Sequence, residues 1–342
     1  MRTQCKPNFF LVGGPKSGTT AMYRYLASHP EIGMSRDKEP HFFAADIEQH
    51  QRHSVTLPHY LRNFERAAGK KRIGEASTSY LASPRAAQEI FDFYPAARII
   101  VILRNPIDVM HALFSQRRLT GREHISRFES AVDSTVTRYW QSGRFRGEPI
   151  LQLTYREATR FSEQVARYLL RFGREHVHIV LFDDFARAPR VEYEKVLSFL
   201  ELPLDGRRDF EKVNGNKRMR SELLQKRLRQ LSRKFWRVER SFPVLCEGLR
   251  GIMARINFVS EPRPDMDPDF RRRLAMEYAP EIRNLERLLD RSLDHWLDRP
   301  RAGPTESAPP KLPAVDVRNA FLSVGDGATG VINASPYSTV TR

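Results

Sequence analysis

Residues 8–20 decide the fold of this chain, and they read Asn8-Phe-Phe-Leu-Val-Gly-Gly-Pro-Lys-Ser-Gly-Thr-Thr20. The apolar run Phe9–Val12 predicts a strand buried on both faces, as in the centre of a parallel sheet. The glycine pair that follows allows a tight turn, and Gly18 opens a helical segment that extends to Ser28. Backbone N–H groups and the positive end of that helix then converge, which predicts an anion-binding loop.

The position of the lysine in this loop argues against one large class of phosphate-binding proteins. Kinases and ATPases with a P-loop carry G-x-x-x-x-G-K-[ST], in which the lysine directly follows the last glycine. Here Lys16 stands two residues before Gly18. An NTP-dependent kinase of related fold is therefore an alternative that the spacing disfavours, and magnesium dependence would reveal it.

The loop resembles the 5′-phosphosulfate loop of the sulfotransferase family. Its residues match the family pattern P-[KR]-[SCG]-G-T-[TS] at every position, as Pro15, Lys16, Ser17, Gly18, Thr19 and Thr20. The resemblance implies that they bind the sulfo donor 3′-phosphoadenosine 5′-phosphosulfate (PAPS), which leaves as 3′-phosphoadenosine 5′-phosphate (PAP). It also implies that the Lys16 ammonium stabilises the charge that develops on the departing phosphate.

A second match, Lys38-Glu-Pro-His-Phe-Phe43, resembles an element of the branch that acts on heparan sulfate and other carbohydrates. In that branch the glutamate is the proposed base, so the resemblance implies that Glu39 removes the proton from an acceptor hydroxyl. His41 is the second candidate, because phenol and alcohol sulfotransferases use a histidine and imidazole titrates near neutrality. Alternatively, Glu39 is an exposed partner of Lys38, and His41 orients Glu39, binds the acceptor or only packs.

A third match, Arg98–Asp108, resembles the strand and turn that hold the 3′-phosphate of the nucleotide. Arg104 ends the predicted strand at the carboxyl edge of the sheet, and its guanidinium suits a phosphate. In the family a serine follows this arginine by eight residues, and here that position is Ala112. Ser115, one helical turn onward, is the candidate substitute. This departure keeps open a noncatalytic basic protein that binds PAP.

Two further matches complete the predicted site. Gly74-Glu75-Ala-Ser-Thr-Ser-Tyr80 resembles a short strand and turn beneath the family's active site, where Glu75 either faces the acceptor or braces the loop. Asn214–Ser221 resembles a late basic loop that closes over the nucleotide, with Lys217 and Arg218 as its phosphate contacts. A solvated run of charge is the alternative for that loop. No metal ion is expected in the reaction.

The predicted elements alternate between strands and helices, as a parallel sheet covered by helices requires. We therefore expect an α/β fold with a P-loop-like central parallel sheet flanked by helices, followed by a basic helical C-terminal elaboration. The predicted strands are Asn8–Val12, Arg72–Ala76, Arg98–Leu103 and His176–Phe182. The predicted helices are Gly18–Ser28, Pro84–Phe93, Ile107–Leu119, Tyr155–Phe172 and Pro189–Leu200.

The amino-acid composition of the C-terminal part of the chain changes twice. Between residues 220 and 256, apolar residues at steps of three and four line a basic helix, which packs on the core or meets an anionic acceptor or membrane surface. A further amphipathic helix is expected over Asp269–Trp296. Proline, glycine and small polar residues then predominate, so residues 1–298 are expected to form the sulfotransferase domain and residues 299–342 a mostly disordered tail.

Composition and charge narrow the range of partners. The 342 residues include 57 Lys and Arg against 41 Asp and Glu, a net charge of +16 that favours anionic ligands. The basic residues are spread without a zinc-finger or recognition-helix pattern, so a nucleic-acid partner is not expected. Cys5 and Cys246 are too few for a disulfide framework and are expected to be reduced.

No segment is expected to cross a membrane. Residues 1–7 leave no room for a cleavable signal peptide before the first strand, and Phe242–Phe258 is too short and too charged to span a bilayer. Animal enzymes of the resembling carbohydrate branch usually carry an N-terminal Golgi anchor, so the resemblance without such a segment implies a bacterial, cytoplasmic enzyme. It is predicted to transfer a sulfo group from PAPS by in-line displacement to a hydroxyl of a carbohydrate or glycolipid, with an amine as the second choice. Neither the sugar nor the oligomeric state is encoded in a recognisable pattern.

Overall fold

The computed structural model describes residues 5–47, 56–120, 122–141, 154–211, 217–219, 258–260 and 265–297. These residues belong to one compact unit, Met1–Pro300. The basic helix expected between residues 220 and 256 lies outside them, as does the tail expected from residue 299. The domain boundary at residue 298 and the helical elaboration therefore stay predictions.

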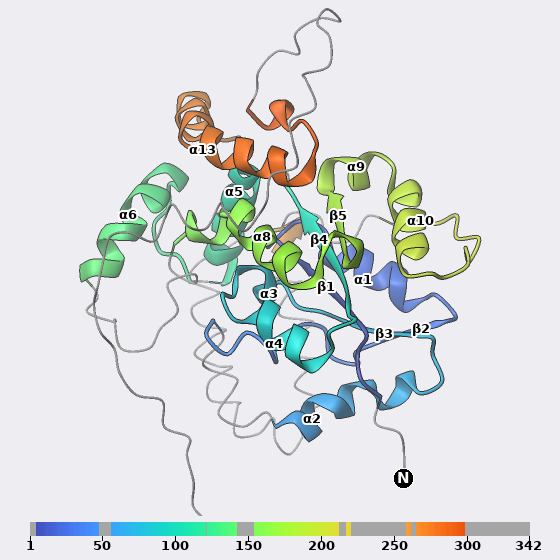
Figure 1. The fold of residues 1–342 in the computed structure, drawn as a ribbon. Helices are drawn as coiled ribbons and strands as arrows, with labels where there is room; N and C mark the ends of the chain where they lie inside the picture. The colour runs from blue at the N-terminus through green and yellow to red at the C-terminus, as the bar shows by residue number, and fades with distance from the viewer. Residues whose placement is uncertain are drawn as a thin grey trace, which may run out of the picture. The chain divides into compact units, whose positions relative to one another are not determined.

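A parallel sheet of five strands, in the order β2-β3-β1-β4-β5, forms the centre of this unit (Figure 1). Its strands are β1 (Phe9–Gly13), β2 (Ile32–Met34), β3 (Arg72–Ala76), β4 (Arg98–Leu103) and β5 (Val177–Leu181). β1 lies between β3 and β4, and all of its residues are buried. This is the helix-flanked parallel sheet that the sequence predicts.

Side chains that alternate along β1 pack into two separate hydrophobic layers. Phe10 and Val12 join the layer formed with α3 (Ser79–Ala82), α4 (Ala86–Phe93), α5 (Pro106–Thr120), α8 (Phe161–Phe172) and α13 (Pro268–Leu289). Phe9 and Leu11 join the layer formed with α1 (Thr19–Ala27), α9 (Phe182–Arg187) and α10 (Pro189–Phe199). Successive residues of a strand point to opposite faces, so a central strand covered on both sides has to be apolar throughout.

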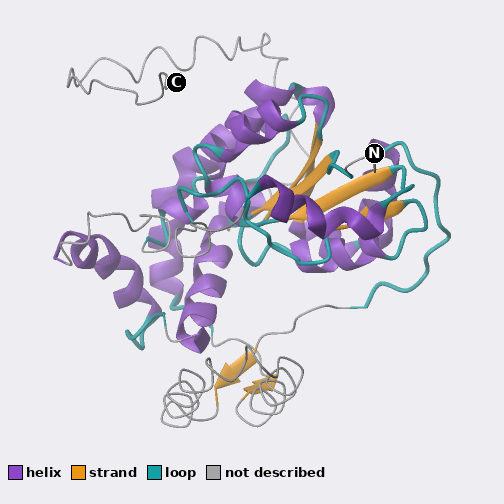
Figure 2. Cartoon of the chain, turned by 90° about the horizontal axis from the view of Figure 1, so that it is seen from below, coloured by secondary structure: helices purple, strands orange, loops and turns teal. Residues whose placement is uncertain are grey.

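The remaining elements lie around this core, and the strands of the central sheet are seen between helices in Figure 2. β6 and β7 pair antiparallel with each other, separately from the central sheet. These elements are α2 (Leu57–Leu61), α6 (Phe128–Gln141), β6 (Lys217–Met219), β7 (Phe258–Ser260) and the 3₁₀ helices η2 (Arg62–Ala67), η3 (Glu157–Thr159), η4 (Arg174–His176) and η5 (Asp294–Leu297).

Most predicted helices are somewhat shorter than expected, and for three of them a local backbone feature explains the difference. Gly18 has a φ of 96°, so it caps α1 instead of belonging to it. The helix expected from Tyr155 is divided into η3 and α8 because Arg160 adopts a φ of −78° and a ψ of 67°. The helix expected to reach Trp296 ends at Leu289, because Asp290 turns into the left-handed region with a φ of 52°.

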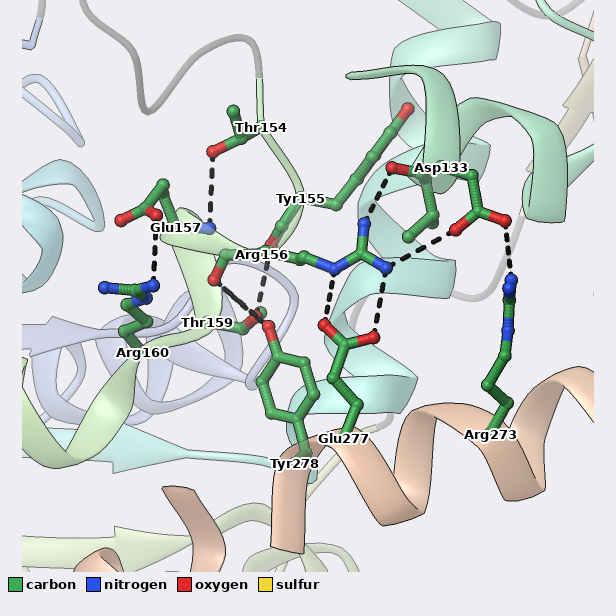
Figure 3. A network of polar contacts seen from close by, with 11 residues as sticks. Asp133, Thr154, Tyr155, Arg156, Glu157, Thr159, Arg160, Arg273, Glu277 and Tyr278 are labelled. Carbon is green, nitrogen blue, oxygen red and sulfur yellow. Dashed lines mark hydrogen bonds and ion pairs between the residues drawn. The ribbon is translucent and has the colours of Figure 1, made fainter. Parts of the chain in front are cut away.

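A polar network fastens α13 to α6 and to the turn at η3 (Figure 3). The Arg156 guanidinium donates to both carboxylate oxygens of Glu277, at 2.5 and 3.0 Å, and to the Val132 carbonyl at 2.9 Å. The hydroxyl of Tyr278 donates to the Arg156 carbonyl at 3.1 Å. Asp133 accepts a bond from Arg156 and is also paired with Arg273 on α13. These bonds fix a late helix of the chain against elements far earlier in the sequence.

Candidate active site

Three loops with predicted site residues meet at the carboxyl edge of the sheet. Gly14–Gly18 follows β1, and Arg104 follows the neighbouring strand β4. On the other side of β1, the Glu39 N–H donates to the carbonyl of Ala76, the last residue of β3, at 2.9 Å. This is the edge at which open α/β sheets bind ligands, because the carboxyl ends of parallel strands lie together there.

The loop after β1 is held close to the sheet by backbone bonds. Gly14 N–H donates to the Ile102 carbonyl on β4 at 3.0 Å, and Ser17 N–H donates to the Gly14 carbonyl at 3.2 Å. A Cβ at Gly13 would stand 2.6 Å from the Ile102 carbonyl oxygen, so only glycine fits there. The helical bonds of α1 begin with Ala21 N–H to the Gly18 carbonyl.

The first turn of α1 therefore presents the backbone amides of Gly18, Thr19 and Thr20, which precede the helical hydrogen-bonding pattern. Lys16 is exposed, and Pro15 and Thr20 are partly exposed. Ser17 is fully buried, and its Oγ has no hydrogen-bond partner among the described residues. A hydroxyl donor left unpaired beneath a loop costs about 1–3 kcal/mol, and its dipole favours an anion above it. The loop thus fits a phosphate or sulfate group.

Arg104 connects the loop after β1 to the end of β5. Its Nη1 donates to the Lys16 carbonyl at 3.2 Å, and its guanidinium lies over the Phe182 ring, with 4.6 Å to the centroid. Phe182 also borders Gly18, since a Cβ there would lie 3.1 Å from the ring. A guanidinium carries five N–H donors, so one bond to a carbonyl leaves capacity for a phosphate.

Glu39 and His41 lie together on the loop beside β3. Oε2 of Glu39 is 3.6 Å from Nε2 of His41, and Oε1 of Glu39 is paired with the Lys38 ammonium. Nδ1 of His41 shares a 2.5 Å hydrogen bond with the Ser79 hydroxyl. The imidazole thus bridges Glu39 and Ser79, while its ring is mostly shielded from solvent. The alternative pairing of Glu39 with Lys38 is present in the same arrangement.

The three predicted catalytic residues share an unusual backbone conformation. Five non-glycine residues in the described ranges have a positive φ, and they are Lys16, Glu39, His41, Glu201 and Asp290. The left-handed region costs a non-glycine residue about 1–2 kcal/mol, and residues held there cluster at functional sites. Three of the five are the side chains that the sequence assigns to the chemistry.

Glu75 lies beneath this loop, at the end of β3, and is fully buried. Its burial favours the second of the two alternatives, bracing of the loop, which stays a prediction. Burial raises the pKa of Glu75 from 4.5 to about 7, although the hydroxyls of Tyr80, Tyr60 and Ser77 lie close enough to lower it. Neither carboxylate oxygen makes a hydrogen bond of standard geometry with the described residues.

The candidate 3′-phosphate contact Ser115 lies on α5, and the late basic loop with its predicted phosphate contacts lies beside this helix. Ala112, at the family's serine position, is buried, and the partly exposed Ser115 donates to the His111 carbonyl at 3.0 Å. Lys217 and Arg218 belong to β6, whose backbone runs beside α5. Their side chains lie outside the part of the chain that is described. Ser115, Lys217 and Arg218 therefore stay predictions as ligand contacts.

Sequence reasoning missed the residues of η5 that reach this edge of the sheet. The side-chain amide of Asn105, the residue after Arg104, donates to the Trp296 carbonyl at 3.0 Å. The Trp296 indole in turn donates to Asp183, the residue after Phe182, at 2.6 Å. No spacing in the sequence links these three residues. Ser79 could have been considered, because it lies within the matched stretch that ends at Tyr80.

The family is settled by the extent of one match. A family model described as "Sulfotransferase domain" matches residues 6–241. The chain belongs to the sulfotransferase family. All three loops at the carboxyl edge lie inside the matched range, so the resemblance inferred from them is confirmed. Among the described residues of this sulfotransferase, no group of His, Cys, Asp and Glu side chains could hold a metal ion.

A solved structure extends the likeness to most of the chain. The sulfotransferase from Alicyclobacillus acidocaldarius is 28% identical, with a TM-score of 0.64, and the match covers 85% of this chain and 99% of that one. This likeness, together with the sheet order, confirms the predicted fold class. No helix in the described ranges combines the length and the hydropathy that crossing a bilayer requires.

Curated relatives of this sulfotransferase match smaller parts of the chain and are much longer. Mouse carbohydrate sulfotransferase 15 is 23% identical over 59% of this chain and 45% of its own length. The bifunctional heparan sulfate N-deacetylase/N-sulfotransferase 1 of Caenorhabditis briggsae is 20% identical over 58% and 23% of the two chains. The membrane-associated sulfotransferase kil1 of Dictyostelium discoideum is 33% identical over 30% of this chain and 21% of its own length. The chain thus spans less than half the length of these relatives.

Proposed function

We propose that this sulfotransferase moves the sulfo group of PAPS to a hydroxyl of a carbohydrate or glycoconjugate. The observation that carries the proposal is the meeting of Lys16, Glu39, His41 and Arg104 at one edge of the sheet, on loops bonded to adjacent strands. Relatives named for carbohydrate and heparan sulfate support the acceptor class. The N-sulfotransferase among them keeps an amine as the second choice.

The donor side of the proposed reaction uses the loop after β1 and the guanidinium after β4. The amides of Gly18, Thr19 and Thr20, with Pro15 and Ser17 shaping the turn, hold the 5′-phosphate. Arg104 neutralises the 3′-phosphate, with Ser115, Lys217 and Arg218 as further contacts on the same side. Lys16 stabilises the negative charge that grows on the phosphate oxygen as its bond to sulfur breaks.

The acceptor side uses Glu39 and His41. Glu39 takes the proton of the acceptor hydroxyl while that oxygen forms its bond to sulfur, and the S–O bond to the phosphate breaks in line. His41, in contact with Glu39 and Ser79, orients the carboxylate. A carboxylate base needs to lie within hydrogen-bond reach of the hydroxyl, and the open edge beside Glu39 allows this. No residue of the chain changes its oxidation state.

Calorimetry with PAP and with ATP plus magnesium tests the donor class. We expect PAP to bind and ATP plus magnesium to bind far more weakly, and we expect Arg104→Ala to weaken PAP by about 10–100-fold, the value of a charge-assisted contact. Lys70→Ala is the control, because it removes a positive charge from the surface just before β3, and it should leave the PAP affinity unchanged. Tight magnesium-dependent ATP binding would favour the kinase instead.

Transfer from ³⁵S-labelled PAPS tests the acceptor class. We expect label to appear in at least one member of a panel of unsulfated polysaccharides that includes heparosan and chondroitin. PAP binding without transfer to any member would favour the noncatalytic basic protein. We also propose that the protein is bacterial and cytoplasmic and that it contacts anionic membranes peripherally. Cell fractionation would test where the protein is found.

A further inference from the structure

Glu75 is a buried carboxyl group that no step of the proposed reaction uses. It is the next-to-last residue of β3, has no exposed surface, and lies near the hydroxyls of Tyr60, Ser77 and Tyr80. Among the described residues it has no hydrogen bond of standard geometry. A carboxyl group is expensive to bury, so a chain that keeps one in its core needs a reason.

The three side chains around Glu75 contact three successive residues of the loop over residues 38–44. The Ser77 hydroxyl accepts the His41 N–H at 3.2 Å. The Tyr60 ring stacks on Phe42, with 4.3 Å between centroids. The Tyr80 hydroxyl accepts the Phe43 N–H at 3.2 Å. Residues 41–43 are therefore attached, one by one, to the surroundings of a single carboxyl group.

The hydroxyls of Ser77 and Tyr80 act toward the loop as acceptors. Each therefore keeps its own hydrogen for another group, because a hydroxyl donates one hydrogen and accepts through its oxygen. Both hydroxyls lie close enough to Glu75 to lower the pKa of its carboxyl group, so this carboxyl group is within reach of their hydrogens.

The loop needs such support because its backbone is strained. Glu39 and His41 both have a positive φ, of 63° and 52°. Non-glycine residues stay in that region only where the surroundings hold them there. The Glu39 amide is held by the end of β3, and the His41 amide by Ser77.

We propose that Glu75 is a positioning residue for sulfo transfer, which acts through Ser77, Tyr60 and Tyr80 to hold Glu39 and His41 in their reactive orientation. The inference rests on the proposed function for the identity of the reaction. It does not require Glu75 to touch donor or acceptor. The loss of Glu75 should therefore loosen the loop over residues 38–44 and leave the loop over residues 13–20 unchanged.

The test is hydrogen–deuterium exchange of the whole chain with Glu75→Gln, an isosteric change. We expect amides in residues 38–44 to exchange about tenfold faster, while those in residues 9–20 keep their rates. Glu192→Gln is the matched control, because Glu192 is also a buried glutamate, on α10 in the other hydrophobic layer. Ser77→Ala should reproduce the loosening, and it serves as the second variant if Glu75→Gln does not fold.

Sulfo transfer from labelled PAPS supplies the second readout. We expect Glu75→Gln to lower kcat about tenfold or more with the KM for PAPS within about twofold, and the double variant with Ser77→Ala to add little, because both changes break one chain of contacts. Unchanged exchange over residues 38–44, or equal loosening of residues 9–20, would overturn the inference. If the wild type neither binds PAP nor transfers sulfate, the proposed function fails, while the exchange result still decides whether Glu75 braces the loop.

Discussion

Lys16, Glu39 and His41 each adopt a backbone conformation that favours glycine, and each is held by a contact from outside its own loop. Arg104 binds the Lys16 carbonyl, the Ala76 carbonyl binds the Glu39 amide, and the Ser77 hydroxyl binds the His41 amide. These contacts oppose about 1–2 kcal/mol of strain per residue. The side chains are therefore aimed by the sheet edge, and their direction does not depend on the local sequence alone.

Lys16→Ala should slow the reaction much more than it weakens nucleotide binding. The ammonium is proposed to act on charge that develops only as the S–O bond breaks, so its loss should lower kcat by about two powers of ten or more. The measurement is transfer kinetics from labelled PAPS together with PAP calorimetry. Lys70→Ala is the control. Equal losses in kcat and PAP affinity would point to a binding role for Lys16.

Glu39→Gln and His41→Gln should separate the base from the group that orients it. Loss of a general base lowers turnover by about 10²–10⁴-fold, so we expect the larger drop with Glu39→Gln. His41→Gln should keep more activity, because the carboxylate stays and only its contact at 3.6 Å is lost. Transfer rates measured from pH 5.5 to 9 for both variants provide the check. The reverse ranking would make His41 the base.

Glu75 should make the stability of the chain fall as the pH rises. Burial raises its pKa in the folded chain from 4.5 to about 7, and the groups that face it are Tyr60, Ser77, Tyr80 and, more distantly, Tyr168. Between these two values the unfolded chain has lost a proton that the folded chain keeps, so its stabilising effect is complete below pH 4.5 and is lost as the pH rises through 7.

The shift corresponds to about 3 kcal/mol at most. Relative to the wild type, Glu75→Gln should therefore gain stability as the pH is raised from 5 to 8, and denaturant unfolding at both pH values would measure it. A difference between the two chains that does not change with pH would contradict this expectation.

At the level of elements, continuous apolar runs were the reliable signal. Strands β3 and β4 have the predicted bounds, Arg72–Ala76 and Arg98–Leu103, and β1 differs by one residue at each end. β2 was missed because three residues carry too little pattern, and it becomes a strand through its pairing with β3, where Ile32 lies opposite Arg72. Short edge strands depend on a partner more than on their own sequence.

The candidate site was predictable where its residues are neighbours in sequence, as in Pro15–Thr20 and Lys38–Phe43. The contact of Tyr60 with Phe42 and that of Trp296 with Asp183 join segments far apart in the chain. No spacing rule specifies such pairs, because they depend on how helices pack on the sheet. The left-handed conformations of Glu39 and His41 were equally out of reach, since neither residue type favours them.

Arg156→Ala should destabilise the docking of α13. The guanidinium makes two bonds to Glu277 and one to the Val132 carbonyl, and it is only partly exposed, so we expect a loss of about 1–2 kcal/mol in the free energy of unfolding. Arg160→Ala is the control, because its single contact with Glu157 is exposed and longer. Urea unfolding of both variants gives the comparison, and equal losses would show that the network in Figure 3 adds nothing.

For the whole molecule, the excess of positive charge should assist the binding of any anionic substrate. With a net charge of +16, the affinity for PAP should fall by at least about threefold as salt is raised from 50 to 500 mM, because added ions screen the field of the protein. Calorimetry at several salt concentrations would measure this. Adenosine, which lacks phosphate groups, is the reference ligand. If the PAP affinity did not change with salt, the net charge of the protein would not contribute to binding, and only the direct contacts of Arg104 and Lys16 would.

The left-handed conformations of Lys16, Glu39 and His41 also bear on how such a chain evolves. Glycine or asparagine at all three positions would relieve the backbone strain, whereas the same changes would remove the side chains that are proposed to carry the chemistry. Selection for stability and selection for activity therefore act in opposite directions on the same codons. Drift toward glycine there would mark descendants that have become pseudoenzymes, even where the rest of the fold is intact.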